Sequence, residues 1–239
     1  MLAPLLAVTL LAPTLGSAQR DAGAAPRDDV RTLVRRCVAA YGGKPALARA
    51  AVTRQEGRVT SILHPGAPGR ILRAYARPGR LRVETAFAET ERETRVLDGG
   101  RGWRNGEAVE SARLAAMILQ AARLDLPALL SAWEARLQDH GTAELDGGTV
   151  RVVGLQPAPG LLVEAAIDTA TARIVRSRGS SRDPAMPLEF VTTYEDFRTV
   201  DGVLVAFRER NWANGRSTGE TVLEKVEFPK TLPDALFRP

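Results

Sequence analysis

Residues 111–138, SARLAAMILQAARLDLPALLSAWEARLQ, carry the long helical pattern in the middle of a chain that is otherwise rich in strand patterns. Asp125 before Leu126 and Pro127 predicts a break, with a second helix starting near the proline. Apolar residues recur at helical spacing on both sides of the break, at Leu114, Met117, Ile118 and Ala121 and then at Leu126, Leu129, Leu130, Trp133 and Leu137. The apolar faces of this pair must lie on the surrounding sheet. They form either a lid over a concave sheet or the closing layer of a packed core.

The segments on both sides of the helical pair have the two-residue period of β-strands. Residues 80–87 alternate almost without error, and residues 160–167 do the same. Turn signals such as Asn105-Gly106 and Asp146-Gly147-Gly148 separate these segments about every ten residues. The pattern predicts an α+β protein with a large antiparallel meander in which every strand has one polar face toward solvent.

A helix is expected before the first strand. Val30, Leu33, Val34, Cys37, Val38 and Tyr41 follow the i, i+3, i+4, i+7 pattern, and Gly42-Gly43 is typical of a helix C-terminus. Cys37 is the only cysteine and lies on the apolar stripe, so we expect a buried thiol and no internal disulfide.

The N-terminus predicts secretion. The apolar run 5–15 is too short to span a bilayer comfortably and ends in small residues at Gly16-Ser17-Ala18. We therefore expect a signal peptide over residues 1–18, a tether over 19–28 and a single domain over 29–239. No basic residue precedes Arg20, which is atypical of a signal peptide, and the residue directly after the cleavage site is Gln19 and not a cysteine, so we expect no lipid anchor there.

Composition limits the partners. The net charge is +5, and the basic residues are dispersed arginines interleaved with acidic residues, without a basic run. Aromatic residues make up only 5%, which disfavours a stacking platform for single-stranded nucleic acid. We expect no nucleic-acid site, although a modest attraction to anionic lipid headgroups is compatible with this charge.

Catalytic patterns are weak. The two histidines, His64 and His140, have no second ligand at metal-binding spacing, so we expect no metal and no cofactor. His140 is read as a favourable partner of a helix C-terminus. Residues 215–219, GRSTG, match a nucleophile motif, but an alternating strand follows Ser217 and no histidine comes after it, so we read a hairpin turn and expect no enzyme activity.

Two motifs resemble a known family. Residues 77–84, RPGRLRVE, and residues 96–103, VLDGGRGW, are similar to the Arg-Pro junction and the Asp-Gly-aromatic segment of the LolA/LolB-type carriers, the outer-membrane lipoprotein-sorting superfamily of the bacterial periplasm. The order of predicted elements also matches over nearly the whole chain. The chain differs from the carriers in a longer C-terminus, residues 228–239, and in having few aromatics for a cavity.

The resemblance implies a half-open antiparallel barrel whose helical lid covers an apolar cavity, and a non-catalytic periplasmic carrier of acyl chains from lipids or lipoproteins. It also implies that Arg77 fastens the lid, against the alternative of an exposed arginine at a strand end. The first alternative is an envelope sensor or interaction module of the same fold that detects lipids or mislocalised proteins and signals to a partner, such as a protein of the inner or outer membrane. The second alternative is a hydrolase that uses carboxylates in the cleft. The candidate cavity residues, which would otherwise pack a closed core, are Leu81, Val83, Phe87, Leu114, Ile118, Leu130, Trp133, Leu161, Val163, Ile167, Val203, Val205 and Phe207.

Overall fold

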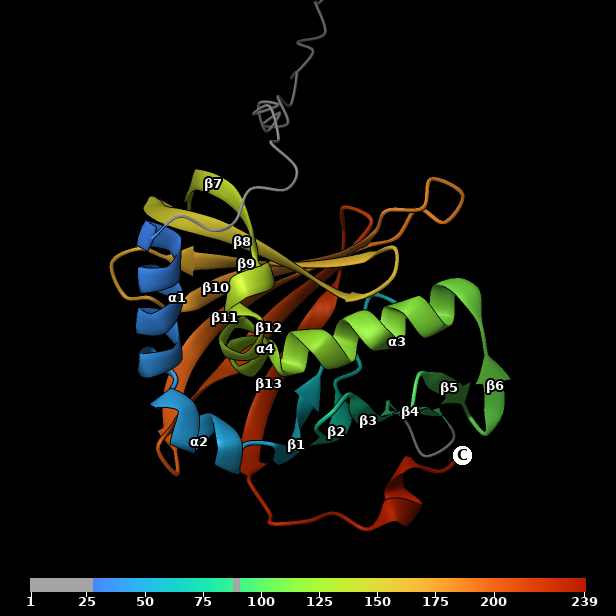
Figure 1. The fold of residues 1–239 in the computed structure, drawn as a ribbon. Coiled ribbons are helices and arrows are strands. Elements are labelled where there is room, and N and C mark those ends of the chain that lie inside the picture. The colour runs from blue at the N-terminus through green and yellow to red at the C-terminus, as the bar shows by residue number, and fades with distance from the viewer. Residues whose placement is uncertain (1–27, 88–90) are drawn as a thin grey trace, which may run out of the picture.

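A computed structural model describes residues 28–87 and 91–239, which form one open antiparallel sheet and four α-helices (Figure 1). The predicted signal peptide, 1–18, and nearly all of the predicted tether, 19–28, lie outside the described residues. The strands are β1 (Val52–Val59), β2 (Gly69–Ala76), β3 (Arg80–Ala86), β4 (Arg92–Asp98), β5 (Arg101–Arg104), β6 (Glu107–Val109), β7 (Gln138–Leu145), β8 (Gly148–Ala158), β9 (Leu161–Asp168), β10 (Ile174–Ser181), β11 (Glu189–Val200), β12 (Val203–Ala213) and β13 (Arg216–Glu227). The helices are α1 (Asp28–Ala40), α2 (Gly43–Arg49), α3 (Ser111–Leu124) and α4 (Leu126–Ala132).

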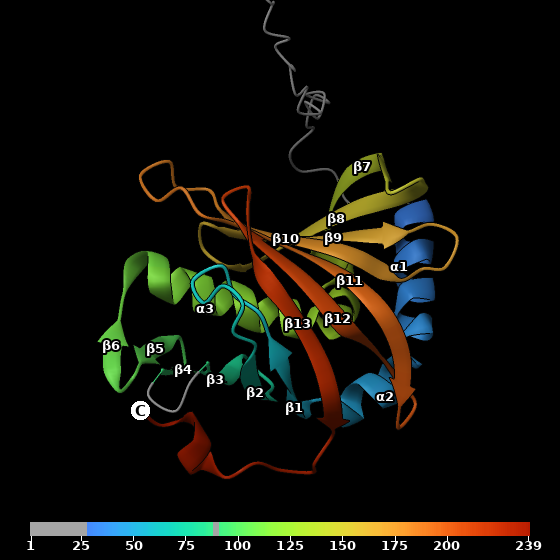
Figure 2. The same ribbon diagram turned by 180° about the vertical axis from the view of Figure 1, so that it is seen from behind.

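The strand order confirms the predicted half-open meander. Strands β1 to β6 pair in chain order, and so do strands β7 to β13. The two halves are joined where β1 pairs with β13. The order therefore runs from β6 through β1 and β13 to β7, and β6 and β7 end the described sheet without pairing to each other. The segment that connects these two ends contains α3 and α4, and Figures 1 and 2 show α3 inside the curve of the sheet.

The helical pair is bent by 80° at Asp125, as the sequence predicted. The second helix is shorter than expected, because it ends at Ala132 and a 3-10 turn leads into β7 at Gln138. Among the described residues no single helix is long and apolar enough to cross a membrane; α3 and α4 reach that length and apolarity only when taken together across their bend.

Two apolar clusters fix the helices on the sheet. In the larger cluster Leu126 and Leu130 pack with α1 and with the inner residues of β8 and β9. In the smaller cluster Met117 and Ala121 of α3 pack on Leu81 of β3. Part of the helical pair therefore completes a closed core, which was one of the two alternatives.

The expectation that every strand has a polar face is wrong for β9. Its first seven residues are all buried, because Leu161, Val163 and Ile167 face the main core while Glu164 on the other face is covered by side chains of neighbouring strands. Strand β6, with only three residues, was not predicted, since so short a segment shows no period.

Helix α1 buries Cys37 completely, as expected, and this burial raises the pKa of its thiol to about 12. Gly42 ends the helix with φ 96°. A Cβ atom at Gly42 would lie 2.0 Å from the carbonyl oxygen of Gly202, so glycine allows the β11–β12 turn to pack on this corner.

The C-terminal extension covers the outer face of β2. Phe237 is 1% exposed and packs on Ala74 and Ala76, whose small side chains leave room for the ring. The guanidinium group of Arg80 lies 4.3 Å from the ring centroid of Phe237. Residues 228–239 are thus part of the domain (Figure 2).

Candidate functional site

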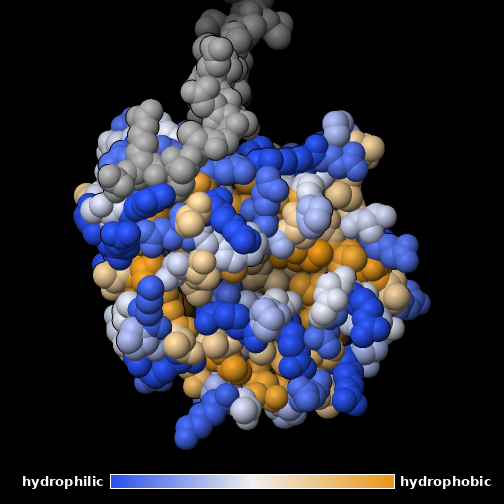
Figure 3. Space-filling model, viewed as in Figure 1, coloured by the Kyte–Doolittle hydropathy of each residue, from blue (hydrophilic) through white to orange (hydrophobic). Residues whose placement is uncertain are grey.

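A cavity of about 540 Å³ lies between α3 and the concave face of the sheet. Helix α3 contributes Ala116, Leu119, Gln120 and Arg123, and the facing wall comes from β1–β4 and β9–β13. This volume is within the range of about 300–1,000 Å³ that is usual for ligand pockets. Figure 3 shows hydrophobic side chains gathered across the middle of the face on which α3 is seen in Figure 1.

The cavity opens at one rim of the sheet. Its outer lining comes from the loop that follows β1, the end of β3 and the turn between β12 and β13, which an antiparallel meander brings to the same edge. His64 stacks on Phe87 with ring centroids 4.0 Å apart, and its Nδ1 lies 3.0 Å from a carboxylate oxygen of Glu91. The same loop carries Ile62 and Leu63, which are 56% and 80% exposed.

A buried ionic cluster forms the deep wall. The guanidinium of Arg73 donates to both carboxylate oxygens of Glu209 at 2.9 and 2.8 Å, and Arg123 of α3 approaches the same carboxylate at 3.3 Å. Burial alone would raise the pKa of Glu209, but the two arginines outweigh it and hold this pKa well below its usual range. The cluster joins β2, β12 and α3, and its three members were not predicted as site residues.

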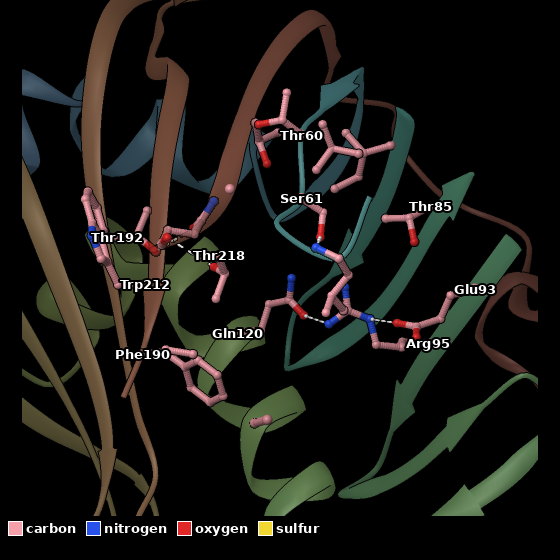
Figure 4. Close-up of a pocket in the computed structure, with 18 of the residues that line it drawn as sticks. Thr60, Ser61, Thr85, Glu93, Arg95, Gln120, Phe190, Thr192, Trp212 and Thr218 are labelled. Atoms are coloured by element: carbon pink, nitrogen blue, oxygen red, sulfur yellow. Dashed lines mark hydrogen bonds and ion pairs between the residues drawn. The ribbon is translucent and has the colours of Figure 1, made fainter. Parts of the chain in front are cut away.

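Arg95 of β4 projects into the middle of the cavity. Its Nη1 donates to Oε1 of Gln120 at 3.3 Å, and its Nε lies 3.1 Å from Glu93, as the dashed lines in Figure 4 show. Thr192, Trp212 and Thr218 lie across from these residues in the same view. The cavity therefore combines an apolar lining with a set of arginines.

At the opposite rim Arg77 binds the junction of α3 and α4. Its Nε donates to Oδ2 of Asp125 at 2.8 Å, its Nη2 donates to Oδ1 at 2.5 Å, and its Nη1 donates to the carbonyl oxygen of Leu47 at 3.2 Å. The Asp125 side chain is 6% exposed and that of Arg77 is 30% exposed. The hydrogen bond to Asp125 raises the pKa of Arg77 despite partial burial, and burial together with the charge of Asp125 raises that of Tyr75.

The predicted cavity residues fall into four groups. Phe87 and Val163 line the large cavity, whereas Val203 and Val205 line a smaller one of about 110 Å³ beside Arg77 and α4. Phe207 packs instead with Leu223 and Val226. The remaining candidates lie in or against the two apolar clusters, namely Leu81, Val83, Leu114, Ile118, Leu130, Trp133, Leu161 and Ile167.

The reading of His140 as a helix-end partner is wrong. His140 lies in β7, at a bulge, and its Nδ1 is 2.5 Å from Oε1 of Glu164 on the outer face of the sheet. Arg178 donates to the other oxygen of Glu164 at 2.7 Å. Burial would raise the pKa of Glu164, but these two partners lower it to about 2.

The other chemical motifs are structural in the described chain. Ser217 lies at the start of β13 directly after the turn at Asn214 and Gly215, which confirms the hairpin reading. Within residues 28–87 and 91–239 no group of three or more His, Cys, Asp or Glu side chains is placed to hold a metal ion.

No protein-family model matches the chain, and no curated protein matches it in sequence. Among solved structures it is similar to a LolA superfamily protein from Nitrosomonas europaea, with 12% identity and a TM-score of 0.52, over 81% of this chain and 96% of that one. A domain from Vibrio parahaemolyticus assigned to outer membrane lipoprotein sorting matches with 11% identity and a TM-score of 0.46, over 87% and 95% of the two chains. The MucA/MucB complex of Pseudomonas aeruginosa matches with 11% identity and a TM-score of 0.25, over 88% and 97%.

The first of these matches shows the class of fold. The chain has the LolA-like fold of a curved antiparallel sheet around a helical insert, as the sequence motifs indicated. The two matches with TM-scores below 0.5 add no weight to this assignment.

Proposed function

We propose that this protein is a non-catalytic periplasmic carrier that binds acyl chains of lipids or lipoproteins in the large cavity. The observation that carries the proposal is the cavity itself, about 540 Å³ between α3 and the sheet, in a fold of the LolA-like class. Phe87, Phe190 and Trp212 give it apolar surface, and the rim beside Phe87 offers an opening for a chain.

The helical insert supports a cavity whose cover can move. The joint between α3 and α4, in the middle of the insert, is held at Asp125 through a bidentate ion pair by Arg77, a residue of the turn between β2 and β3. A shift of the insert therefore requires that this ion pair open and that Leu126 and Leu130 partly leave their apolar contacts with α1 and β9. Arg77 in this proposal fastens the insert, and membrane partner proteins would act on it during loading or release.

A chain-length series tests the binding of acyl chains. Each buried methylene contributes about 0.8 kcal/mol, so the affinity for straight-chain alcohols and acids should rise about fourfold per added carbon until the cavity is filled. Displacement of a fluorescent acyl probe measures these affinities on the purified full chain.

Substitutions on α3 supply the matched comparison. Ala116 lines the cavity, whereas Ala112, one helical turn earlier, is exposed. Ala116→Trp should abolish probe binding with little change in the melting temperature, and Ala112→Trp should bind as the wild type does. Equal binding by the two variants, or no dependence on chain length, would refute the carrier proposal and favour the sensor alternative.

A further inference from the structure

The large cavity carries more positive than negative charge. Four arginines line it, Arg73, Arg92, Arg95 and Arg123, together with only two glutamates, Glu91 and Glu93. Glu209 beside the deep wall neutralises one of the two arginines that bind it. The four arginines and three glutamates together therefore carry a net charge of +1.

The excess lies where charges are poorly solvated. Arg73 is 3% exposed, and the Arg123 side chain is 12% exposed. Burial is the main cause that lowers the pKa of Arg95, and the charges of Arg73 and Arg123 lower it further, against the opposite effect of Glu93. The region around these three guanidinium groups is thus electropositive and would be stabilised by an anion.

One of these arginines keeps a buried hydrogen-bond donor unused. Nε of Arg73 is buried and makes no hydrogen bond to the described part of the chain, whereas Nε of Arg95 and Nη1 of Arg123 lie 3.1 Å and 3.3 Å from the carboxylates of Glu93 and Glu209. Buried donors without an acceptor are rare in folded proteins, since each costs free energy. The free donor of Arg73, together with the excess positive charge of the lining, indicates an acceptor that comes from a ligand.

The positions of the arginines indicate which end of the ligand lies deep in the cavity. Arg123 lines both the large cavity and the smaller one near the opposite rim, so it marks the deep end. Phe87 and Trp212 lie at strand ends, on the side of the open rim. The polar end of a ligand is therefore best stabilised inside, and its apolar chain lies toward the rim.

We propose that the large cavity binds a single-chain amphiphile with an anionic head group, a carboxylate or a phosphate, which enters head first and is held by Arg73, Arg95 and Arg123. This inference rests on the proposed acyl-binding function and narrows its ligand class. The chain lies against Phe87, Phe190 and Trp212. Guanidinium groups suit both head groups, because each carries five N–H donors and its protein partners use only some of them.

Ligands that share one chain length test the head group. Laurate, dodecyl phosphate and dodecanol are compared at pH 8 by displacement of an uncharged fluorescent acyl probe, with acetate and inorganic phosphate as head groups without a chain. At least one of the two anionic dodecyl compounds should bind about tenfold or more tightly than dodecanol, and the pair separates the carboxylate from the phosphate. The two chainless ions should not displace the probe.

Arg95 and Arg104 provide matched variants, since both pair with Glu93 but only Arg95 lines the cavity. Arg95→Met should bring the anion-to-alcohol preference close to one, and Arg104→Met should keep it.

Three outcomes would overturn this inference, and they differ in what they say about the carrier. If dodecanol binds as tightly as both anionic compounds in the wild type, the head-group site is wrong while the carrier proposal stands. If the chainless ions displace the probe, the site is one for free anions. If no dodecyl compound binds at all, the carrier proposal fails together with the inference. The wild-type series decides the question even if a variant fails to fold.

Discussion

Removal of the Arg77 side chain should loosen the helical insert while the domain stays folded. In Arg77→Met the aliphatic stem is kept, but Asp125 loses its two charged donors and remains 6% exposed at the helix junction. After this substitution Tyr75 remains as a hydrogen-bonding neighbour of the Asp125 carboxylate. The substitution therefore leaves a buried negative charge without its cation.

The size of the effect follows from burial. Removing one partner of a fully buried ion pair costs about 3–5 kcal/mol. Because the Arg77 side chain is 30% exposed, water weakens this pair, and we expect about 2–3 kcal/mol. If that free energy stabilises the closed insert, the opening equilibrium should shift by about 30- to 150-fold.

Two assays separate local opening from global destabilisation. Hydrogen exchange should become faster by this factor at the amides of α4 and the last turn of α3, and not in the core strand β9. Release of a fluorescent acyl probe, followed by stopped flow, should be faster as well. Asp125→Asn should give a similar effect, and the double variant should cost less than the sum of the two single variants.

Arg80→Met is the control. Arg80 lies three residues after Arg77 and pairs with Asp98 and Asp234, so its loss should affect the C-terminal segment and leave α4 unchanged. If Arg77→Met and Arg80→Met have equal exchange at α4 and equal release rates, Arg77 does not fasten the insert.

Three further predictions concern stability. Leu130→Ala should lower the free energy of unfolding by about 2–5 kcal/mol in chemical denaturation, because Leu130 is 0% exposed in the main core, whereas Leu63→Ala at the exposed loop should change it by less than about 0.5 kcal/mol. The depressed pKa of Glu164 means that its stabilisation is complete above pH 4.5 and is lost as the pH falls toward 2; up to about 3 kcal/mol should disappear over this window, and Glu164→Gln should show a flatter pH profile of stability. Gly42→Ala should lower the melting temperature by at least about 4 °C, since its Cβ would collide with the Gly202 carbonyl; an unchanged melting temperature would show that this corner can move apart.

Sequence patterns predicted individual strands and helices well, because these elements depend on residues that are close together in the chain. The alternation of residues 80–87 placed β3 within one residue of its observed end, and the break at Asp125 was predicted from the proline that follows. The overall arrangement as a half-open barrel came from the resemblance, because no local pattern says that β1 pairs with β13.

The buried charges could not be predicted in this way. Arg73 and Glu209 are 136 residues apart and each occurs in a strand where a charged side chain normally faces solvent. Glu164 interrupts an apolar run in the same manner and is buried because His140 and Arg178 reach it from other strands. Only the sheet register brings these partners together, so sequence patterns could not indicate the arginines of the cavity. Of the apolar candidates, Phe87 and Val163 line the large cavity.

The most direct test of the carrier account is mass spectrometry of the full chain purified without detergent, measured both under native conditions and after extraction with organic solvent. A carrier should hold a stoichiometric acyl-bearing molecule that is absent from Ala116→Trp, and this molecule should have an anionic head group if the arginine site is correct. A protein that carries no such molecule and also fails to take up a fluorescent acyl probe would contradict the account, and the helices would then form only the closing layer of a packed core.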